Sequence, residues 1–254
     1  MPNPSSLYRV RIWDLPTRVF HWATALCVLG LAVTGTVGGS AMVFHFRFGY
    51  ALLTLLLFRM VWGLIGGHWS RFRSFVFGPR AVFAYLRGHV PESHSVGHSP
   101  LGALSVWAML AFLILQAATG LISDDEISTA GPLTHLVSHA AVSLGSQYHT
   151  QLGKWILLAL VLLHVAAIIH HVRRRQGLLA AMLHGDKQLP VPAEAARDDA
   201  RSRMTAFYCF VCVLPLCSGC QVWRQPAFEA GALNWKPAFL TPPVELFPLA
   251  KQSH

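Results

Sequence analysis

Charged residues are scarce in this chain. Asp, Glu, Lys and Arg make up 12% of the 254 residues, and only 11 residues are Asp or Glu. A soluble domain carries about 25% charged residues. So low a fraction, beside 54% hydrophobic residues, argues against a soluble domain and indicates an all-α integral membrane protein surrounded by membrane lipid. The net charge of +9 is spread between apolar runs, so we expect no nucleic-acid partner.

Four apolar runs are long enough to cross a bilayer as helices, which takes about 20 residues each. No clear small-residue cleavage site follows the first run, so we interpret it as an anchored helix and not as a removed signal. A fifth run, residues 204–223, is shorter and contains Pro215. Proline costs a helical hydrogen bond, but the run still predicts a probable fifth transmembrane helix. The first four runs span about residues 18–39, 42–66, 101–122 and 148–175.

The polar segments complete the expected organisation. Residues 1–16 are a short arm, residues 17–203 hold the four spans and end in a basic linker, and residues 224–254 are an extended tail. Fourteen Lys and Arg residues lie on one side of the first four spans, against only Arg47 and Lys154 on the other. The positive-inside rule makes the richer side cytoplasmic, so the amino terminus is expected to be inside.

This orientation gives a depth to the histidines that lie in the spans. His21 lies near the cytoplasmic face, and His45 lies near the outer face. His149 and His164 share the fourth span, where a separation of 15 residues corresponds to about 22 Å along a helix. His149 is then near the outer face and His164 is toward the cytoplasm. The arginine counts therefore predict two pairs at matched depths, His45 with His149 and His21 with His164.

Two imidazoles facing each other inside a helical bundle are typical of haem ligation. Zinc usually takes four ligands, often including thiolate or carboxylate, and the spans contain no carboxylate. Haem iron takes two axial ligands. Gly49 and Gly153 each lie four residues after a paired histidine and so on its helical face. They could give clearance to a macrocycle, or could equally serve packing between helices.

Two arginines are candidate partners for the propionates of such a haem. Arg47 lies at the outer end of the second span, where it could equally contact lipid headgroups. Arg59 lies deeper in the same span, where an arginine is costly without a partner.

The remaining histidines and the cysteines are weaker candidates. His135 and His139 are alternative outer ligands, whereas we interpret His170 and His171, beside three arginines, as polar end groups. A CxxC-x4-CxxC pattern would indicate a zinc or iron–sulfur site in a soluble loop. Here it lies in an apolar run, so we interpret its members as small residues of a membrane helix. They are Cys209, Cys212, Cys217 and Cys220.

Four segments, spread over about residues 10–205, carry motifs that occur together in a known family. They are WDLPTRVFHW (13–22), HFRFGYALL (45–53) leading to FRMVWGLIG, HSPLGALSVWAMLAFLILQAATGL (98–121), and HTQLGKWILLALVLLHVAAIIHH followed by MLHGDK. The combination resembles the bacterial cytochrome b561 group, which is related to the membrane cytochrome b subunits of nickel–iron hydrogenases. The resemblance implies a four-helix core in the bacterial inner membrane. It also implies two b-type haems, with axial histidines from helices one, two and four.

The resemblance further implies electron transfer between the quinone pool and a redox partner, such as a periplasmic c-type cytochrome or a hydrogenase-like subunit. An electron-transfer component is therefore expected more than a stand-alone enzyme. The acidic loop at residues 124–126 could dock such a partner, or could simply be solvated. One alternative is a quinone-coupled superoxide oxidase, as some relatives are, in which Lys154 or Arg47 attracts the anion. Another is a haem-free membrane anchor, or a protein that binds metal through its cysteines.

Overall fold

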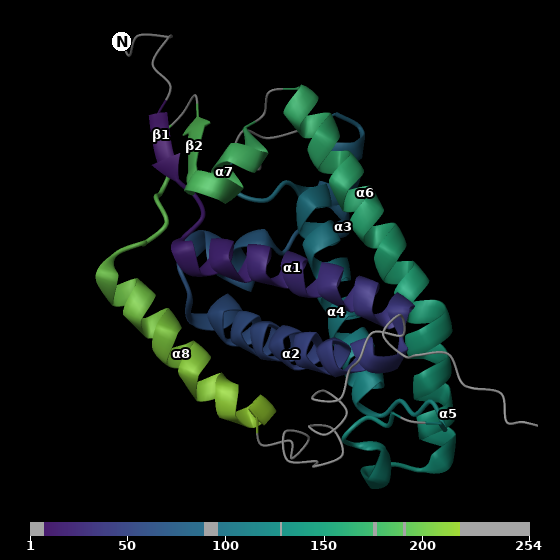
Figure 1. The fold of residues 1–254 in the computed structure, drawn as a ribbon. Coiled ribbons are helices and arrows are strands. Elements are labelled where there is room, and N and C mark those ends of the chain that lie inside the picture. Colours follow the sequence, from purple (N-terminus) through teal and green to yellow (C-terminus); the bar gives the residue numbers. More distant parts are fainter. Residues whose placement is uncertain (1–7, 89–95, 128, 175–176, 190–191, 219–254) are drawn as a thin grey trace, which may run out of the picture.

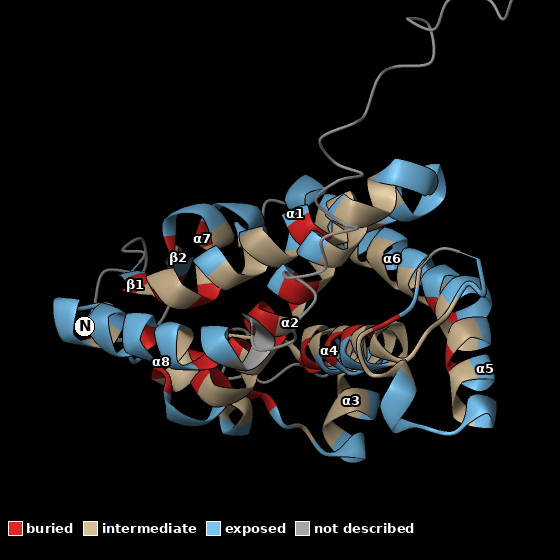
Figure 2. Ribbon diagram, turned by 60° about the horizontal axis from the view of Figure 1, so that its bottom comes forward, coloured by how far each residue is buried: buried red, intermediate tan, exposed pale blue. Residues whose placement is uncertain are grey.

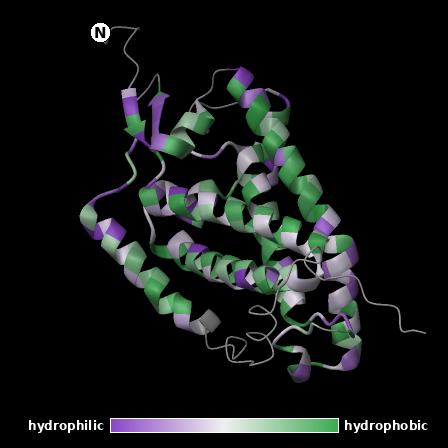
Figure 3. Ribbon diagram, viewed as in Figure 1, coloured by the Kyte–Doolittle hydropathy of each residue, from purple (hydrophilic) through white to green (hydrophobic). Residues whose placement is uncertain are grey.

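Four helical segments dominate the structure, a computed structural model that describes residues 8–88, 96–127, 129–174, 177–189 and 192–218. Within these ranges, four segments are long and apolar enough to cross a membrane. They overlap the four expected spans and confirm an all-α membrane bundle. Figure 3 shows hydrophobic residues along these helices and hydrophilic residues in the short strands. The four segments are Leu15–Val37, Gly39–Ile65, Pro100–Leu121 and His139–Arg173.

The individual elements follow one another in a simple order (Figure 1). The helices are α1 (Leu15–Val37), α2 (Met42–Ile65), α3 (Pro79–Leu86), α4 (Pro100–Leu121), α5 (His139–Gln147), α6 (Lys154–Arg173), α7 (Leu178–His184) and α8 (Ala200–Ser218). Two strands, β1 (Tyr8–Arg11) and β2 (Asp186–Leu189), form an antiparallel pair. Short 3₁₀ turns cover Gly39–Ala41, His68–Ser70, Phe72–Phe75 and Thr134–Leu136.

Local sequence explains where the first helix begins and ends. Asp14 caps α1 by accepting a hydrogen bond from the Thr17 N–H at 2.9 Å, and Pro16 lies in the first turn, where a missing N–H costs nothing. Gly38 ends the helix with a φ of +65°. This left-handed conformation is open to glycine, and it lets the chain reverse directly into α2.

The fourth span is longer than its apolar run predicts. A π-helical turn, Tyr148–Gly153, connects α5 to α6, so one helical segment runs from His139 to Arg173. The sequence had placed the helix start at Tyr148, because the preceding residues are only weakly apolar. Ser138 supplies the actual start, since its side chain accepts a hydrogen bond from Ala141 N–H.

The helices pack in pairs, α1 along α2 and α4 along α6, and α8 lies along α2. Gly30 allows the close approach of α1 to α2, because a Cβ there would lie 2.7 Å from the Phe48 ring. Such contacts through small residues drive helix association in lipid, where the hydrophobic effect is absent. Figure 2 shows that much of the outward surface of the helices is exposed. The buried residues at the centre of the bundle are Cys27, Leu52, Leu55, Leu56, Leu110 and Leu113.

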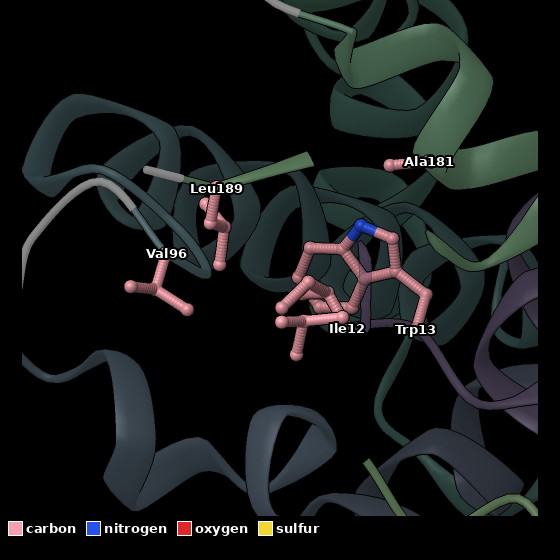
Figure 4. Close-up of a cluster of buried hydrophobic side chains, with 6 residues drawn as sticks. Ile12, Trp13, Val96, Ala181 and Leu189 are labelled. Carbon is pink, nitrogen blue, oxygen red and sulfur yellow. The ribbon is translucent and has the colours of Figure 1, made fainter. Parts of the chain in front are cut away.

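Within the segment expected as a polar arm, residues 8–11 form the strand β1. β1 pairs with β2, so that Tyr8 faces Leu189 and Arg11 faces Asp186. Trp13, Ala181 and Leu189 belong to a buried cluster beneath this sheet (Figure 4). The segment after residue 173, expected as a linker, therefore supplies part of a packed cap. We call this end of the bundle the sheet end.

A fifth transmembrane helix stays a prediction. Residues 200–218 are helical, and Pro215 lies inside α8. However, α8 is not among the four described segments that are long and apolar enough to span. Residues 219–223 of the predicted span, and the predicted tail at residues 224–254, lie outside the described residues.

Candidate functional site

The structure brings together the four histidines that the sequence singles out, in the predicted pairs. The rings of His21 on α1 and His164 on α6 have centres 6.3 Å apart, with 52° between their planes. The rings of His45 on α2 and His149 in the π-helical turn have centres 6.2 Å apart, with 88° between their planes. The first pair lies toward the sheet end and the second toward the opposite end of the bundle.

Both separations fit a metal ion held between two imidazoles. Metal–imidazole bonds are about 2 Å long, and each ring centre lies roughly 1 Å behind its nitrogen. Two such ligands in line therefore place the ring centres about 6 Å apart. Among the described residues, no group of three or more His, Cys, Asp or Glu side chains could hold a metal. The arrangement thus favours a centre with two protein ligands, as in haem, over a zinc site.

The rings differ in what holds their second nitrogen. His149 Nδ1 lies 2.9 Å from the main-chain oxygen of Gln116 on α4. His45 Nδ1 lies 3.3 Å from Thr34 Oγ1 on α1. In the Nδ1–H tautomer, each ring keeps Nε2 as a free metal ligand. His21 Nδ1 is buried and has no hydrogen-bond partner within the described part of the chain.

Comparison with known proteins agrees with this geometry. A family model described as prokaryotic cytochrome b561 matches residues 12–185, which is more than half of the chain and includes both histidine pairs. The chain belongs to the prokaryotic cytochrome b561 family. It is therefore a membrane b-type cytochrome, whose cofactor is haem b and whose role is electron transfer.

Several relatives of this cytochrome have similar names. A probable Ni/Fe-hydrogenase B-type cytochrome subunit of Azotobacter chroococcum mcd 1 is 28% identical over 210 residues, which cover 69% of this chain and 87% of the relative. The corresponding protein of Bradyrhizobium diazoefficiens is 26% identical, with coverages of 70% and 86%. A probable Ni/Fe-hydrogenase 1 B-type cytochrome subunit of Escherichia coli K12 is 24% identical, with coverages of 68% and 88%.

The two candidate arginines of this b561 cytochrome lie in different surroundings. Arg47 lies in the first turns of α2, with its guanidinium 5.6 Å from the Phe44 ring centre. Arg59 is buried, donates to the Ser70 carbonyl at 2.9 Å and lies 4.7 Å from the Phe72 ring centre. Arg59 therefore already has partners in the turns that follow α2. A haem propionate is not needed to explain an arginine at this depth in the span.

The two candidate glycines also differ. A Cβ at Gly49 would meet nothing within 4 Å, so the space beside it is open for a macrocycle. A Cβ at Gly153 would collide with the side-chain amide of Gln116 and approach the Tyr148 ring. The room that Gly153 provides is taken by Gln116, a residue that the sequence analysis did not single out. Its signal was present, because a glutamine interrupts the apolar run of the third span.

The alternative histidines are not brought together with the paired ones. His135 and His139 are exposed, the first in a 3₁₀ turn and the second at the first position of α5. His170 and His171 lie in the last turn of α6, with ring centres 5.7 Å from each other. Of the four cysteines in the CxxC-x4-CxxC pattern, Cys209 and Cys212 are free, while the side chains of the other two lie outside the description.

Proposed function

We propose that this protein is a dihaem subunit that carries electrons across the membrane between a hydrogenase-like redox partner and the quinone pool. The observation that carries the proposal is the presence of two facing imidazole pairs, with ring centres 6.2 and 6.3 Å apart, toward opposite ends of one bundle. In this proposal His45 and His149 hold one haem b, and His21 and His164 hold the other.

Each of the two histidine pairs fixes one position along this path. Haem b, when bound, supplies a one-electron Fe(III)/Fe(II) couple. Each imidazole pair fixes the position of one such couple, and the shared helix α6 with its π-helical turn sets the spacing of the two positions. His149 and His164 are 15 residues apart on that helix, which is about 22 Å at the rise of an α-helix. The apolar bundle between them excludes water, so charge crosses only through the bound groups.

The partner is inferred from the relatives. Several of them are named as B-type cytochrome subunits of Ni/Fe hydrogenases, and this chain aligns with most of their length. A hydrogenase is therefore a better candidate for the partner than a c-type cytochrome. Quinone completes the path, since a lipid-soluble carrier can reach a site within the bilayer.

Haem stoichiometry and spectra test the dihaem proposal. The purified full chain is expected to show a b-type α band in its reduced-minus-oxidised spectrum, with two haems per polypeptide. His149→Ala and His164→Ala should each lose one haem, whereas the exposed His139, changed to Ala, should keep both. One haem in the unchanged protein, or two in His149→Ala, would refute the pairing.

Reduction by hydrogen tests the partner separately. In membranes that contain the full chain and a Ni/Fe hydrogenase, hydrogen gas should reduce the b-type haems, and a short-chain quinone should reoxidise them. Membranes with the double variant His149→Ala/His164→Ala should show neither change. If the unchanged, haem-loaded protein is reduced by quinol but never by hydrogen with hydrogenase present, the hydrogenase partner is wrong and the dihaem assignment still holds.

A further inference from the structure

The two histidine pairs differ in the hydrogen bonds at their Nδ1 atoms. We call His45 with His149 the far pair, because it lies away from the sheet end, and His21 with His164 the sheet-end pair. Both Nδ1 atoms of the far pair have an oxygen partner. In the sheet-end pair, the buried His21 Nδ1 has none among the described residues.

Two oxygens of α1 are hydrogen-bond partners of the His45 ring, the Leu31 main-chain oxygen and Thr34 Oγ1. Thr34 Oγ1 has a single hydrogen, and it donates to the Gly30 carbonyl at 2.6 Å. Toward His45 Nδ1, 3.3 Å away, the same oxygen is left as an acceptor. A Cβ at Gly35 would lie 3.1 Å from His45 Cε1, so the ring packs directly on α1 beside Thr34. His45 is thereby held with Nδ1–H pointing at α1.

Gln116 on α4 makes two hydrogen bonds with His149 in the π-helical turn. The main-chain oxygen of Gln116 accepts from His149 Nδ1 at 2.9 Å, and the Gln116 side-chain amide donates to the His149 main-chain oxygen, also at 2.9 Å. Glycines make room on both sides. A Cβ at Gly120 would lie 2.8 Å from His149 Cε1, and a Cβ at Gly153 would collide with the Gln116 amide.

The sheet-end pair has no comparable anchor. Trp22 packs edge-on against the His21 ring, with centres 5.1 Å apart. No hydrogen bond holds the His164 ring within the described part of the chain, and its ring contact is with His21. The two pairs thus have the same ring separation but different surroundings at Nδ1.

An Nδ1–H that donates to an oxygen makes its imidazole a more basic ligand. A more basic axial ligand stabilises Fe(III) over Fe(II), and so lowers the reduction potential of a haem. We propose that Thr34 and Gln116 are positioning residues that set the reduction potential of the far haem below that of the sheet-end haem. Electrons then pass downhill from the far end of the bundle to the sheet end. This inference rests on the proposed two-haem function.

Redox titration of the purified full chain, followed at the haem α band, tests the proposal. The unchanged protein should show two one-electron transitions. His149→Ala should retain only the one at higher potential, and His164→Ala only the one at lower potential. The reverse assignment would overturn the proposal, as would two equal midpoint potentials.

Two variants perturb the anchors while leaving all four ligands in place. Thr34→Val removes the hydroxyl acceptor for His45 and leaves the Leu31 main-chain oxygen in place. Gly120→Ala places a Cβ against the His149 ring, which must then shift relative to the Gln116 carbonyl. Each variant should raise only the lower of the two midpoint potentials. The shift should lower the ratio of oxidised to reduced far haem about tenfold at a fixed applied potential. For a one-electron couple this is about 59 mV. The control is Thr36→Val, because in the described part of the chain the exposed Thr36 hydroxyl bonds to carbonyls of its own helix.

Haem content separates the two levels of failure. If the unchanged protein holds fewer than two haems, the proposed function itself is wrong. If Thr34→Val and Gly120→Ala keep two haems and both potentials stay where they were, the function stands and the tuning role is refuted. If Gly120→Ala fails to fold, Thr34→Val against Thr36→Val still decides, since valine replaces threonine with little change in shape.

Discussion

Replacing Asp14 should destabilise the sheet end of the bundle far more than the loss of a helix cap alone. The Asp14 side chain is 0% exposed and accepts three hydrogen bonds. They come from the Thr17 N–H at 2.9 Å, from Trp62 Nε1 at 3.2 Å and from Ser70 Oγ at 2.7 Å. One carboxyl group thus joins the start of α1, the last turn of α2 and the 3₁₀ turn that follows it.

The magnitude follows from what Asp14→Ala leaves behind. Loss of the cap costs about 1 kcal/mol. Trp62 Nε1 loses its partner in a buried site, at about 1–3 kcal/mol. Ser70 loses its acceptor too, but it can turn its hydroxyl toward Thr17 Oγ1, 2.8 Å away. The expected loss in the free energy of unfolding is therefore about 2–4 kcal/mol.

A matched variant isolates the buried part of this effect. Asp199 accepts a hydrogen bond from the Ser202 N–H at 2.8 Å, in the first turn of α8, but it is exposed. Asp199→Ala should cost only about 1 kcal/mol, because water replaces the lost acceptor. Equilibrium unfolding in mixed detergent micelles, followed by tryptophan fluorescence, measures both variants. Equal losses of about 1 kcal/mol would refute the reasoning, since the buried contacts of Asp14 would then contribute nothing beyond capping.

Three further predictions concern pH and shape. Burial and the charge of Arg59 lower the pKa of His98 to about 3, so between about pH 6.5 and pH 3 only the unfolded chain takes up its proton. Over this range the free energy of unfolding should fall by up to about 1.4 kcal/mol for each unit by which the pH is lowered. His98→Phe should remove this slope. The hydrogen bond from Arg11 holds the pKa of Asp186 below its usual value. The stabilisation of the fold by ionised Asp186 is therefore complete above about pH 4 and is lost as the pH falls through the lowered pKa. Asp186→Asn should abolish this pH dependence in the same unfolding assay. The Cβ of Gly49→Ala meets nothing within 4 Å, so the variant should leave the unfolding of the haem-free chain unchanged. It should lower the haem content, measured by absorbance, if the macrocycle lies beside it.

The sequence predicted the spans and the histidine pairs because both depend on simple one-dimensional quantities. Span length follows from bilayer thickness, and the depth of His45 or His164 follows from which side holds the arginines. The strand pair could not be predicted in this way. Tyr8 and Leu189 are partners across nearly the whole described chain, and no local pattern in either tetrapeptide identifies the other.

The surroundings of the rings were also out of reach of the sequence. The partner of His149 is a main-chain oxygen on another helix, and every residue has such an oxygen. The π-helical turn at Tyr148–Gly153 adds about one residue to the turn, and so rotates His149 relative to His164 by roughly 100° from its position in an unbroken α-helix. Of the groups around the His149 ring, only the Gln116 side chain could be noticed in the sequence, because it is the single side-chain amide in the apolar run of the third span.

Polar groups within the spans tie the stability of this cytochrome to its cofactor. An imidazole that leaves water for an apolar interior costs free energy unless its nitrogens are bonded, and the His21 ring has a buried nitrogen without a partner in the described chain. Metal ligation satisfies one nitrogen of each ring, and a ligand that binds only the folded chain adds to its stability. The far pair is already anchored by Thr34 and Gln116. The sheet-end pair should therefore depend more on its haem for a fixed geometry, and the sheet beneath which Trp13 is buried closes the bundle at that end.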